Sequence, residues 1–276
     1  MSLRFGEAFF KMTGSGNDFL FFDRRGRHQA EVAGEPLASP ARVAALCARG
    51  TGVGADGVVF LHASAAADFG ILYLNSDGSR AALCGNASLC TSRLAVDLGL
   101  ASPAGLSFET NAGVIRARIR DSMPEIDLES PSELNADTGL PSLAGERRIG
   151  YARAGVPHVV VLCDDVARVD VATRGRALRW HATFPDGANA NFVSRSAAGW
   201  QIRTFERGVE GETLACGTGA VAAAALLRAW GESESSVALQ TASGQLLTVE
   251  FASTHEGRAS LRGEGRLVYR GELSTD

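Results

Sequence analysis

The pattern of apolar and polar residues predicts a similar order of elements twice along the chain. In the first half, short apolar runs bounded by glycine and polar residues predict strands at 5–10, 19–23, 58–61, 68–74, 108–121 and 125–129. In the second half, they predict strands at 149–154, 159–162, 191–195, 200–206, 237–240, 246–252 and 259–269. Helices are expected at 40–49, 91–98, 169–179 and 221–230. Each half is therefore expected to be a mixed sheet wrapped around one central helix, an α+β fold.

An internal repeat is the strongest signal in the sequence. A Cys-Gly pair stands at the predicted start of a helix in each half, at Cys84 and at Cys216. A glycine ends both helices 15 positions after the cysteine, and similar turn sequences follow at 110–115 and 241–246. Matching registers over this distance indicate two pseudo-symmetric copies of one fold.

The repeat also suggests where the domains lie. Residues 130–146 contain prolines, glycines and polar residues and are the expected connection between the two copies. We therefore expect an N-terminal domain at 1–134 and a C-terminal domain at 135–264, with the active site in the cleft between them.

Composition argues against several classes of function. The 276 residues are 45% apolar with a net charge of −4, and the arginines are scattered along the chain, so nucleic-acid binding is not expected. No apolar run reaches membrane-spanning length and the first ten residues lack a secretory pattern, so we expect a cytoplasmic protein without a membrane partner. The five cysteines have no metal-ligand spacing, which argues against disulfides and metal sites; Cys47, Cys90 and Cys163 are interpreted as core residues.

The content of lysine bears directly on mechanism. Lysine occurs once, at Lys11, in an expected strand near the N-terminus. Pyridoxal phosphate enzymes need a lysine for the Schiff base, so pyridoxal chemistry is not expected. The glycine-rich segment 50–57 contains no lysine and leads into a strand, so it does not match a phosphate-binding loop. We expect a protein that uses no cofactor.

The two Cys-Gly helix starts suggest a specific chemistry. At a helix N-terminus the first amides lack intrahelical partners and the dipole is positive, which lowers the pKa of a thiol and favours an anion. Two such ends can hold a carboxylate while Cys84 and Cys216 flank the carbon attached to it. One thiolate would then remove the α-proton, and the other thiol would return a proton to the opposite face. The amides expected to hold the carboxylate are those of Gly85, Asn86, Gly217 and Thr218.

Further polar residues are suited to the recognition of a second amino-acid end. Arg207 can hold a carboxylate in bidentate fashion, Glu206 can accept from an ammonium group, and Asn17, Asn75 and Asn189 supply neutral donors and acceptors. We therefore expect a small amino-acid substrate with two zwitterionic ends.

These residues together resemble the diaminopimelate epimerase family over nearly the whole chain. The resemblance lies in Gly-Ser-Gly-Asn-Asp-Phe around Asn17, Asn-Ser-Asp-Gly-Ser at Asn75, Cys84-Gly85-Asn86, Ala-Asn-Ala-Asn-Phe around Asn189, and 206–220. It implies pyridoxal-independent interconversion of LL- and meso-2,6-diaminopimelate, in the synthesis of lysine and peptidoglycan precursors. It further implies that a strand around 265–276 crosses back to the first domain.

The resemblance also implies roles for individual residues. Cys84 and Cys216 would be the acid and base, and His158 with Glu206 would tune their pKa values. Substrate would be held by Asn17, Asn75, Asn189, Glu206, Arg207 and the amides at 85, 86, 217 and 218.

Three departures from the family pattern bear on substrate choice. Val156 stands where asparagine is usual before Pro-His, Ala87-Ser88-Leu89 replaces the common Gly-x-Arg, and the glycine loop ends at Gly57 where some members carry glutamine. A related racemase of histidine- or proline-type amino acids therefore stays open.

Two other classes of function also stay open. A cysteine hydrolase or acyltransferase would need a histidine base beside the nucleophile and gives the second cysteine no role. A non-catalytic amino-acid binding protein would not need either cysteine. The sequence leaves open whether the chain forms a homodimer.

Overall fold

The computed structural model of the chain describes residues 5–234, 236–251 and 258–274. It contains two compact units, residues 1–126 with 264–276 (unit 1) and residues 127–263 (unit 2). Ala252 and residues 275–276, which we placed in strands, lie outside the described residues. The boundary that we expected after residue 134 falls inside a short strand, β8 (Ser132–Asn135), which pairs with the next strand of unit 2.

Unit 1 contains three α-helices among its described residues, and its strands come from both ends of the chain. The helices are α1 (Gln29–Ala33), α2 (Pro40–Cys47) and α3 (Gly85–Asp97), with a 3-10 turn at Pro36–Ala38. The strands are β1 (Phe5–Gly14), β2 (Asn17–His28), β3 (Gly57–Ala63), β4 (Phe69–Asn75), β5 (Leu106–Thr110), β6 (Gly113–Arg120), β7 (Met123–Glu129) and β17 (Arg266–Ser274). The last residues of β7 lie beyond the unit boundary.

Unit 2 contains two α-helices among its described residues. They are α4 (Val171–Arg179) and α5 (Gly217–Ala229), with a 3-10 turn at Val166–Arg168. The strands after β8 are β9 (Glu146–Ala154), β10 (Val156–Cys163), β11 (Asn189–Ser196), β12 (Gly199–Glu206), β13 (Gly211–Thr213), β14 (Ser236–Gln240), β15 (Leu246–Phe251) and β16 (Arg258–Arg262).

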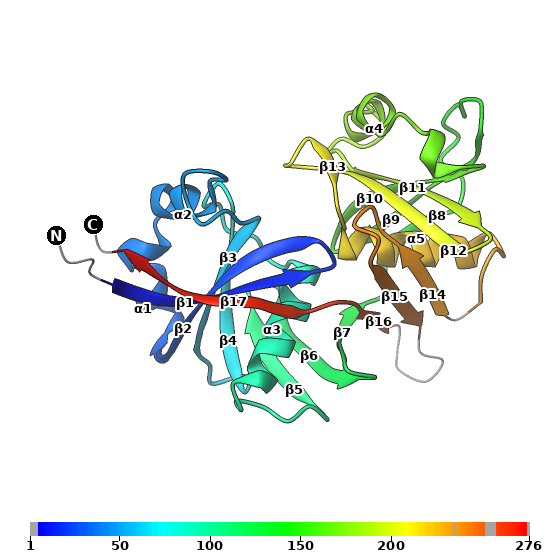
Figure 1. Cartoon of the computed structure of the whole chain (residues 1–276). Helices are drawn as coiled ribbons and strands as arrows, with labels where there is room; N and C mark the ends of the chain where they lie inside the picture. Colours follow the sequence, from blue (N-terminus) through cyan, green and yellow to red (C-terminus); the bar gives the residue numbers. More distant parts are fainter. Residues whose placement is uncertain (1–4, 235, 252–257, 275–276) are drawn as a thin grey trace. The chain divides into compact units, whose positions relative to one another are not determined.

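The strand pairings confirm the internal repeat. In unit 1 the order β17-β1-β2-β3-β4-β5-β6-β7 is antiparallel at every step except β2–β3 and β4–β5. In unit 2 the order β8-β9-β10-β11-β12-β14-β15-β16 is antiparallel except β10–β11 and β12–β14, at the same two steps. Each unit is therefore a mixed sheet with the same connectivity around one helix, as expected (Figure 1).

Two expected strands were wrong. The run 108–121 is two strands, β5 and β6, which pair antiparallel and are joined by a turn at 111–112. The run 259–269 is two strands, because Gly263–Gly265 interrupts it: β16 stays in unit 2 and β17 pairs antiparallel with β1 in unit 1. The chain passes close to α3 at this point, since a Cβ on Gly265 would lie 2.7 Å from the carbonyl oxygen of Leu89. β17 thus supplies the first strand of unit 1 from the C-terminal end of the chain.

The central helix of each unit is buried almost all round. Residues 85–92 of α3 are all buried, and in α5 the buried residues run from Gly217 to Leu227 with one interruption. A helix that is apolar or small on every face fits a fully enclosed position. Small side chains also let strands approach closely: a Cβ on Gly14 of β1 would lie 2.7 Å from the carbonyl oxygen of Asn86. α3 contacts β1, β6 and β17, and α5 contacts β9, β10 and β15 (Figure 1).

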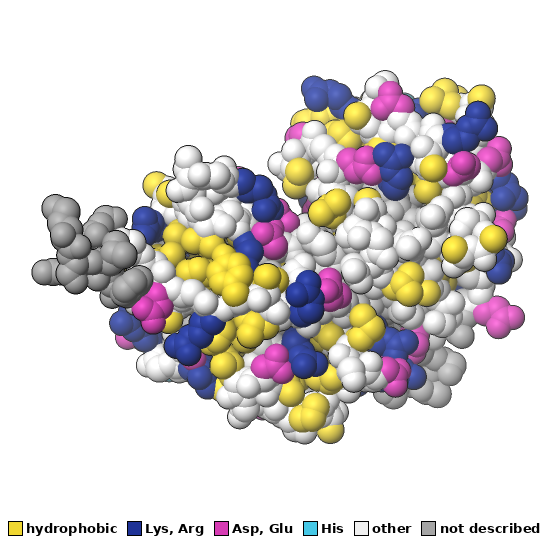
Figure 2. Space-filling model, viewed as in Figure 1, with side chains coloured by type: hydrophobic (Ala, Val, Ile, Leu, Met, Phe, Trp, Pro, Cys, Tyr) yellow, Lys and Arg dark blue, Asp and Glu magenta, His cyan; other side chains and the backbone are white. Residues whose placement is uncertain are grey.

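The other face of each sheet carries a second apolar layer. In unit 1 it includes Phe22, Phe60 and Leu46, and in unit 2 Phe192, Phe205 and Leu178. The space-filling view shows basic and acidic side chains interspersed on the visible face of both units (Figure 2). Within the described part of the chain, no helix is long and apolar enough to cross a membrane.

Candidate active site

Cys84 is the N-cap residue of α3. Its backbone is extended (φ −129°, ψ 116°), and its carbonyl oxygen accepts the first helical hydrogen bond, from Ser88 N at 2.9 Å. The following amides, at Gly85 and Asn86, precede the first helical donor and are oriented along the helix axis. The half-buried thiol therefore lies at the positive end of a helix dipole, which stabilises a thiolate.

Cys216 occupies the equivalent position in unit 2. It is the N-cap of α5 with nearly the same backbone conformation (φ −132°, ψ 109°), and its carbonyl oxygen accepts from Ala220 N at 3.0 Å. The thiol is half-buried, and its Sγ lies 3.6 Å from the hydroxyl of Thr218. The two candidate catalytic cysteines thus share one local structure in two separate units.

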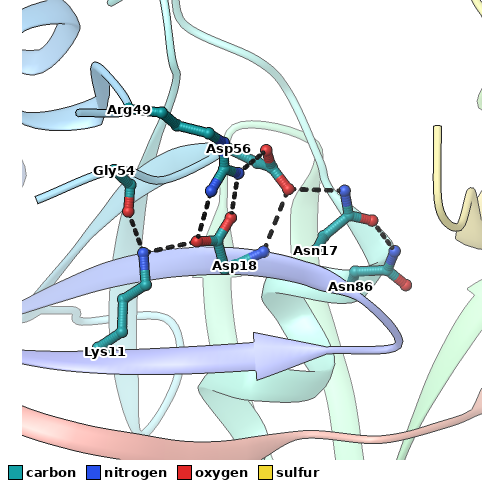
Figure 3. Close-up of polar contacts among 7 residues, drawn as sticks. All are labelled: Lys11, Asn17, Asp18, Arg49, Gly54, Asp56 and Asn86. Carbon is teal, nitrogen blue, oxygen red and sulfur yellow. Dashed lines mark hydrogen bonds and ion pairs between the residues drawn. The ribbon is translucent and has the colours of Figure 1, made fainter. Parts of the chain in front are cut away.

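Asn17 and Asn86 are in direct contact beside the start of α3 (Figure 3). Asn86 Nδ2 donates to Asn17 Oδ1 at 2.7 Å, and Asn17 Nδ2 donates to Asp56 Oδ2 at 2.9 Å. A carboxylate only accepts, so this arrangement fixes which end of the Asn17 amide carries the nitrogen. The turn before Asn17 has positive φ at Ser15 and Gly16, so Asn17 begins β2 and is not the turn residue itself.

A cluster of charges holds Asp56 and the glycine-rich loop in place (Figure 3). Arg49 contacts both Asp18 at 2.6 Å and Asp56 at 2.7 Å. Lys11 lies 2.6 Å from Asp18 and donates to the carbonyl oxygen of Gly54. Burial acts to raise the pKa of Asp18, but hydrogen bonds from Arg49 and Lys11 outweigh it, so the net effect is a lowered pKa. The only lysine of the chain is therefore a buried support behind the candidate site.

Asn75 ends β4 and is fixed by its own turn. Its Nδ2 donates to the Ser79 hydroxyl at 3.0 Å, and its backbone N–H donates to the Ser79 carbonyl at 2.9 Å. Glu206 occupies the matching position at the end of β12 in unit 2. The repeat thus places a polar residue at the end of the same strand in both units.

Asn189 positions the segment that contains Arg207. Its Nδ2 donates to the carbonyl oxygen of Pro157 at 3.1 Å, and its Oδ1 accepts from the backbone N–H of Arg207 at 2.8 Å. The Arg207 guanidinium donates to the carbonyl oxygen of Asp186 at 3.0 Å. Asn189 therefore joins three segments that are far apart in the sequence.

His158 is fully buried in β10, beside Asn189 on the parallel strand β11. Burial, aided by the charge of Arg207, lowers the pKa of His158 to about 3. The ring is therefore neutral at physiological pH and is not a strong base. Its Nδ1 lies 3.2 Å from Nδ2 of Asn191, a residue that sequence reasoning missed. The available signal was the pair Asn189 and Asn191, which share one face of the strand and alternate with the apolar Ala190 and Phe192.

The remaining cysteines are core residues, as expected. Cys47, Cys90 and Cys163 are all buried. Burial raises the pKa of Cys47 to about 11 and that of Cys163 to about 12, and it raises the pKa of Cys90 strongly. Such thiols stay protonated and unreactive at neutral pH. No group of three potential metal ligands occurs among the described residues.

Comparison with known proteins identifies the family. A sequence model described as diaminopimelate epimerase matches residues 9–132 and 150–268. A diaminopimelate epimerase of Gemmatimonas aurantiaca is 48% identical over 97% of this chain and 99% of its own length. The chain belongs to the diaminopimelate epimerase family. Solved structures that share the fold include a Bacillus anthracis phenazine biosynthesis protein (TM-score 0.71, 16% identity, 97% and 98% of the two chains covered) and a probable proline racemase of Agrobacterium radiobacter (0.70, 18%, 98% and 94%).

Three places in the sequence of this diaminopimelate epimerase family member differ from the family pattern described above, and the structure shows where each of them lies. Gly57, at the end of the glycine loop, has no room for a larger residue, since a Cβ there would lie 2.7 Å from the Tyr73 ring. Ala87, Ser88 and Leu89 are buried inside α3. Val156 is the half-buried first residue of β10, two positions before His158.

Proposed function

We propose that this chain epimerises LL-2,6-diaminopimelate to the meso form by a two-base mechanism without a cofactor. The observation that carries the proposal is the pair of cysteines, each the N-cap of the central helix in one copy of the repeat, in a member of this family. The matched backbone conformations support equal roles for the two thiols. A cysteine hydrolase would need one nucleophile and a basic histidine, whereas burial lowers the pKa of His158 to about 3.

In the proposed reaction, the substrate carboxylate binds to amides at the starts of the two central helices. The thiolate of one cysteine, Cys84 or Cys216, removes the α-proton, and the developing negative charge is stabilised by those N–H dipoles. The thiol of the other cysteine gives a proton to the opposite face of the carbon, which inverts the centre. After one turnover the protonation states of the two thiols are exchanged, so the enzyme is ready for the reverse reaction.

The distal, unreacting end of diaminopimelate needs polar recognition. Arg207 can bind its carboxylate through guanidinium N–H groups beyond the one bond that it makes to Asp186. Asn17 keeps a second Nδ2 hydrogen after its bond to Asp56. We propose that these residues, with Asn75, Asn189 and Glu206, hold the substrate.

Turnover in deuterium oxide tests the mechanism. A two-base enzyme should place solvent deuterium at the α-carbon of newly formed product, while substrate recovered early in the reaction keeps its protium. Product that retains the substrate hydrogen would refute the two-base mechanism. The same assay with proline and histidine in place of LL-diaminopimelate tests the alternative racemases, and turnover of those amino acids alone would refute the proposed substrate.

Variants of the two cysteines separate catalysis from binding. Cys84→Ala and Cys216→Ala should each lose nearly all activity but still bind the substrate in calorimetry. Cys163→Ala, which removes a buried thiol of high pKa, is the matched control and should keep its turnover rate. Full activity in either catalytic variant would contradict the proposal.

A further inference from the structure

The side chain of Asn191 has a fixed orientation in unit 2. Its Nδ2 lies 3.1 Å from the carbonyl oxygen of Val159 and 3.4 Å from that of Asn189. Because carbonyl oxygens only accept hydrogen bonds, the amide nitrogen and not the amide oxygen must face them. On the other side, Oδ1 accepts a hydrogen bond from the Thr204 hydroxyl at 3.0 Å. Backbone atoms therefore set the orientation independently of any contact with His158.

This orientation decides which nitrogen of His158 carries the hydrogen. Nδ2 of Asn191 lies 3.2 Å from Nδ1 of His158, and an amide nitrogen donates but does not accept. Nδ1 is therefore the unprotonated nitrogen, and the neutral ring carries its hydrogen on Nε2. Protonation of Nδ1 would direct two N–H groups at each other, so the contact also opposes the imidazolium form.

The Nε2–H group of His158 is a buried donor. Nε2 has no hydrogen-bond partner among the described residues. A buried donor without an acceptor is destabilising, so we infer that a ligand or another reactant supplies the acceptor. Asn189 lies opposite His158 on β11 and accepts from the backbone N–H of Arg207, so the ring lies near the segment that contains a proposed substrate-binding side chain.

The first turn of α5 packs directly on Asn191. A Cβ on Gly219 would lie 2.3 Å from Oδ1 of Asn191 and 3.3 Å from Cβ of Cys216. Asn191 therefore lies between the histidine ring and the helix start that carries the catalytic cysteine of unit 2.

We propose that Asn191 is a positioning residue for the epimerisation, which holds His158 as a neutral Nε2–H donor to an anion in the active site. The proposal rests on the proposed function, because the anion is either the substrate carboxylate or the thiolate of a catalytic cysteine. In this role His158 gives a hydrogen bond and does not take the α-proton. Asn191 acts through the ring and does not itself touch the substrate.

Nitrogen-15 NMR of histidine-labelled protein tests the tautomer without measuring activity. We expect the wild-type His158 ring to be neutral at pH 7 with its hydrogen on Nε2. His158→Gln identifies its signals among those of the five histidines. A wild-type ring with its hydrogen on Nδ1, or with hydrogens on both nitrogens, would overturn the proposal even if no variant could be purified.

Asn191→Asp tests the consequence for catalysis. A carboxylate of the same shape accepts from Nδ1, so the ring should move its hydrogen to Nδ1 or become imidazolium. Loss of one oriented donor should lower kcat on the order of 10²-fold, with KM changed much less. Ser194→Ala is the matched control on the same strand: it removes the acceptor of Val166 N–H and should alter neither kcat nor the His158 tautomer. An Asn191→Asp protein with wild-type kcat would overturn the proposal.

Further spectra identify the anion. A shift of the Nε2 hydrogen when substrate is added to Cys84→Ala protein would identify the carboxylate. A shift between wild type and either cysteine variant without substrate would identify the thiolate. A signal that responds to neither would overturn the donor role. If the tautomer is as stated but the chain epimerises no amino acid, the proposed function fails and the Asn191–His158 geometry stands.

Discussion

Replacing the only lysine tests how much the buried charge cluster of unit 1 contributes to stability. Lys11 and Asp18 are 8% and 20% exposed, and their charged atoms lie 2.6 Å apart. Lys11 also donates to the carbonyl oxygen of Gly54 in the glycine-rich loop. Lys11→Met keeps the unbranched apolar stem but removes the charge and all three donors. It should therefore destabilise the unit without opening a large cavity.

The contacts of the two partners set the expected magnitude. Removing one member of a buried ion pair costs about 3–5 kcal/mol when the other charge is left unpaired. Asp18 keeps Arg49 at 2.6 Å, which lowers this cost. The carbonyl of Gly54 loses its donor, which adds about 1–3 kcal/mol if the group stays buried. We therefore expect the free energy of unfolding to fall by about 2–4 kcal/mol.

Urea unfolding followed by far-UV circular dichroism measures this loss. Arg93→Met is the matched control, because the Arg93–Asp97 pair on α3 is 36% exposed on both sides and should contribute only about 0.5 kcal/mol. All three tryptophans, at 180, 200 and 230, lie in unit 2, so their fluorescence reports separately on the unit that was not changed. A loss in Lys11→Met no larger than that in Arg93→Met would refute the argument.

Three further predictions follow from single contacts. Asp56→Asn replaces an acceptor of the Asn17 amide, so KM for LL-diaminopimelate should rise about tenfold in steady-state assays while the fold is kept. The folded-state pKa of His158, about 3, lies below its usual 6.5, so the folded protein binds fewer protons than the unfolded chain between these pH values. The contribution of His158 to the free energy of unfolding is therefore highest above pH 6.5 and falls as the pH falls towards 3. In unfolding curves, wild type should lose up to about 5 kcal/mol more of its free energy of unfolding than His158→Gln over this range. Gly70→Ala places a Cβ 2.1 Å from Cε1 of the buried His62 and should lower stability by about 1–3 kcal/mol in urea unfolding; an unchanged midpoint would show that the ring can move.

The backbone scheme was largely predictable from the sequence because it depends on local patterns. Apolar runs bounded by glycine located most strands, and the equal spacing from cysteine to glycine predicted two matching helices. The strand 259–269 was wrong because apolar residues continue on both sides of 263–265, and hydropathy alone cannot show that β17 pairs with β1 in the other unit. Only long-range pairing distinguishes one long strand from two strands in different sheets.

The side chains behind the candidate site were much less predictable. The Asn191 network joins residues on β10, β11 and β12, and its contacts with His158 and Thr204 each lie more than ten positions away in the sequence. Lys11 was recognised as a reason to exclude pyridoxal chemistry, but its role in holding Asp18 and Gly54 depends on the fold. Which atom of an amide or imidazole donates and which accepts depends on its neighbours in the folded chain, and residue type alone does not determine it.

The two halves of the repeat match in backbone but differ in the polar groups behind their cysteines. In unit 1 the support is ionic, with Asp18 and Asp56 held by Arg49. In unit 2 the support is a neutral His158 held by an amide, with the charge of Arg207 acting on the ring. In the proposed mechanism one sulfur must be a thiolate while the other is a thiol, and identical surroundings would give the two thiols the same intrinsic proton affinity. A duplicated backbone with different supporting side chains can keep both sulfurs at equivalent helix starts and still give the two thiols different proton affinities. The substrate also has one reacting and one unreacting end, so it meets two chemically distinct halves.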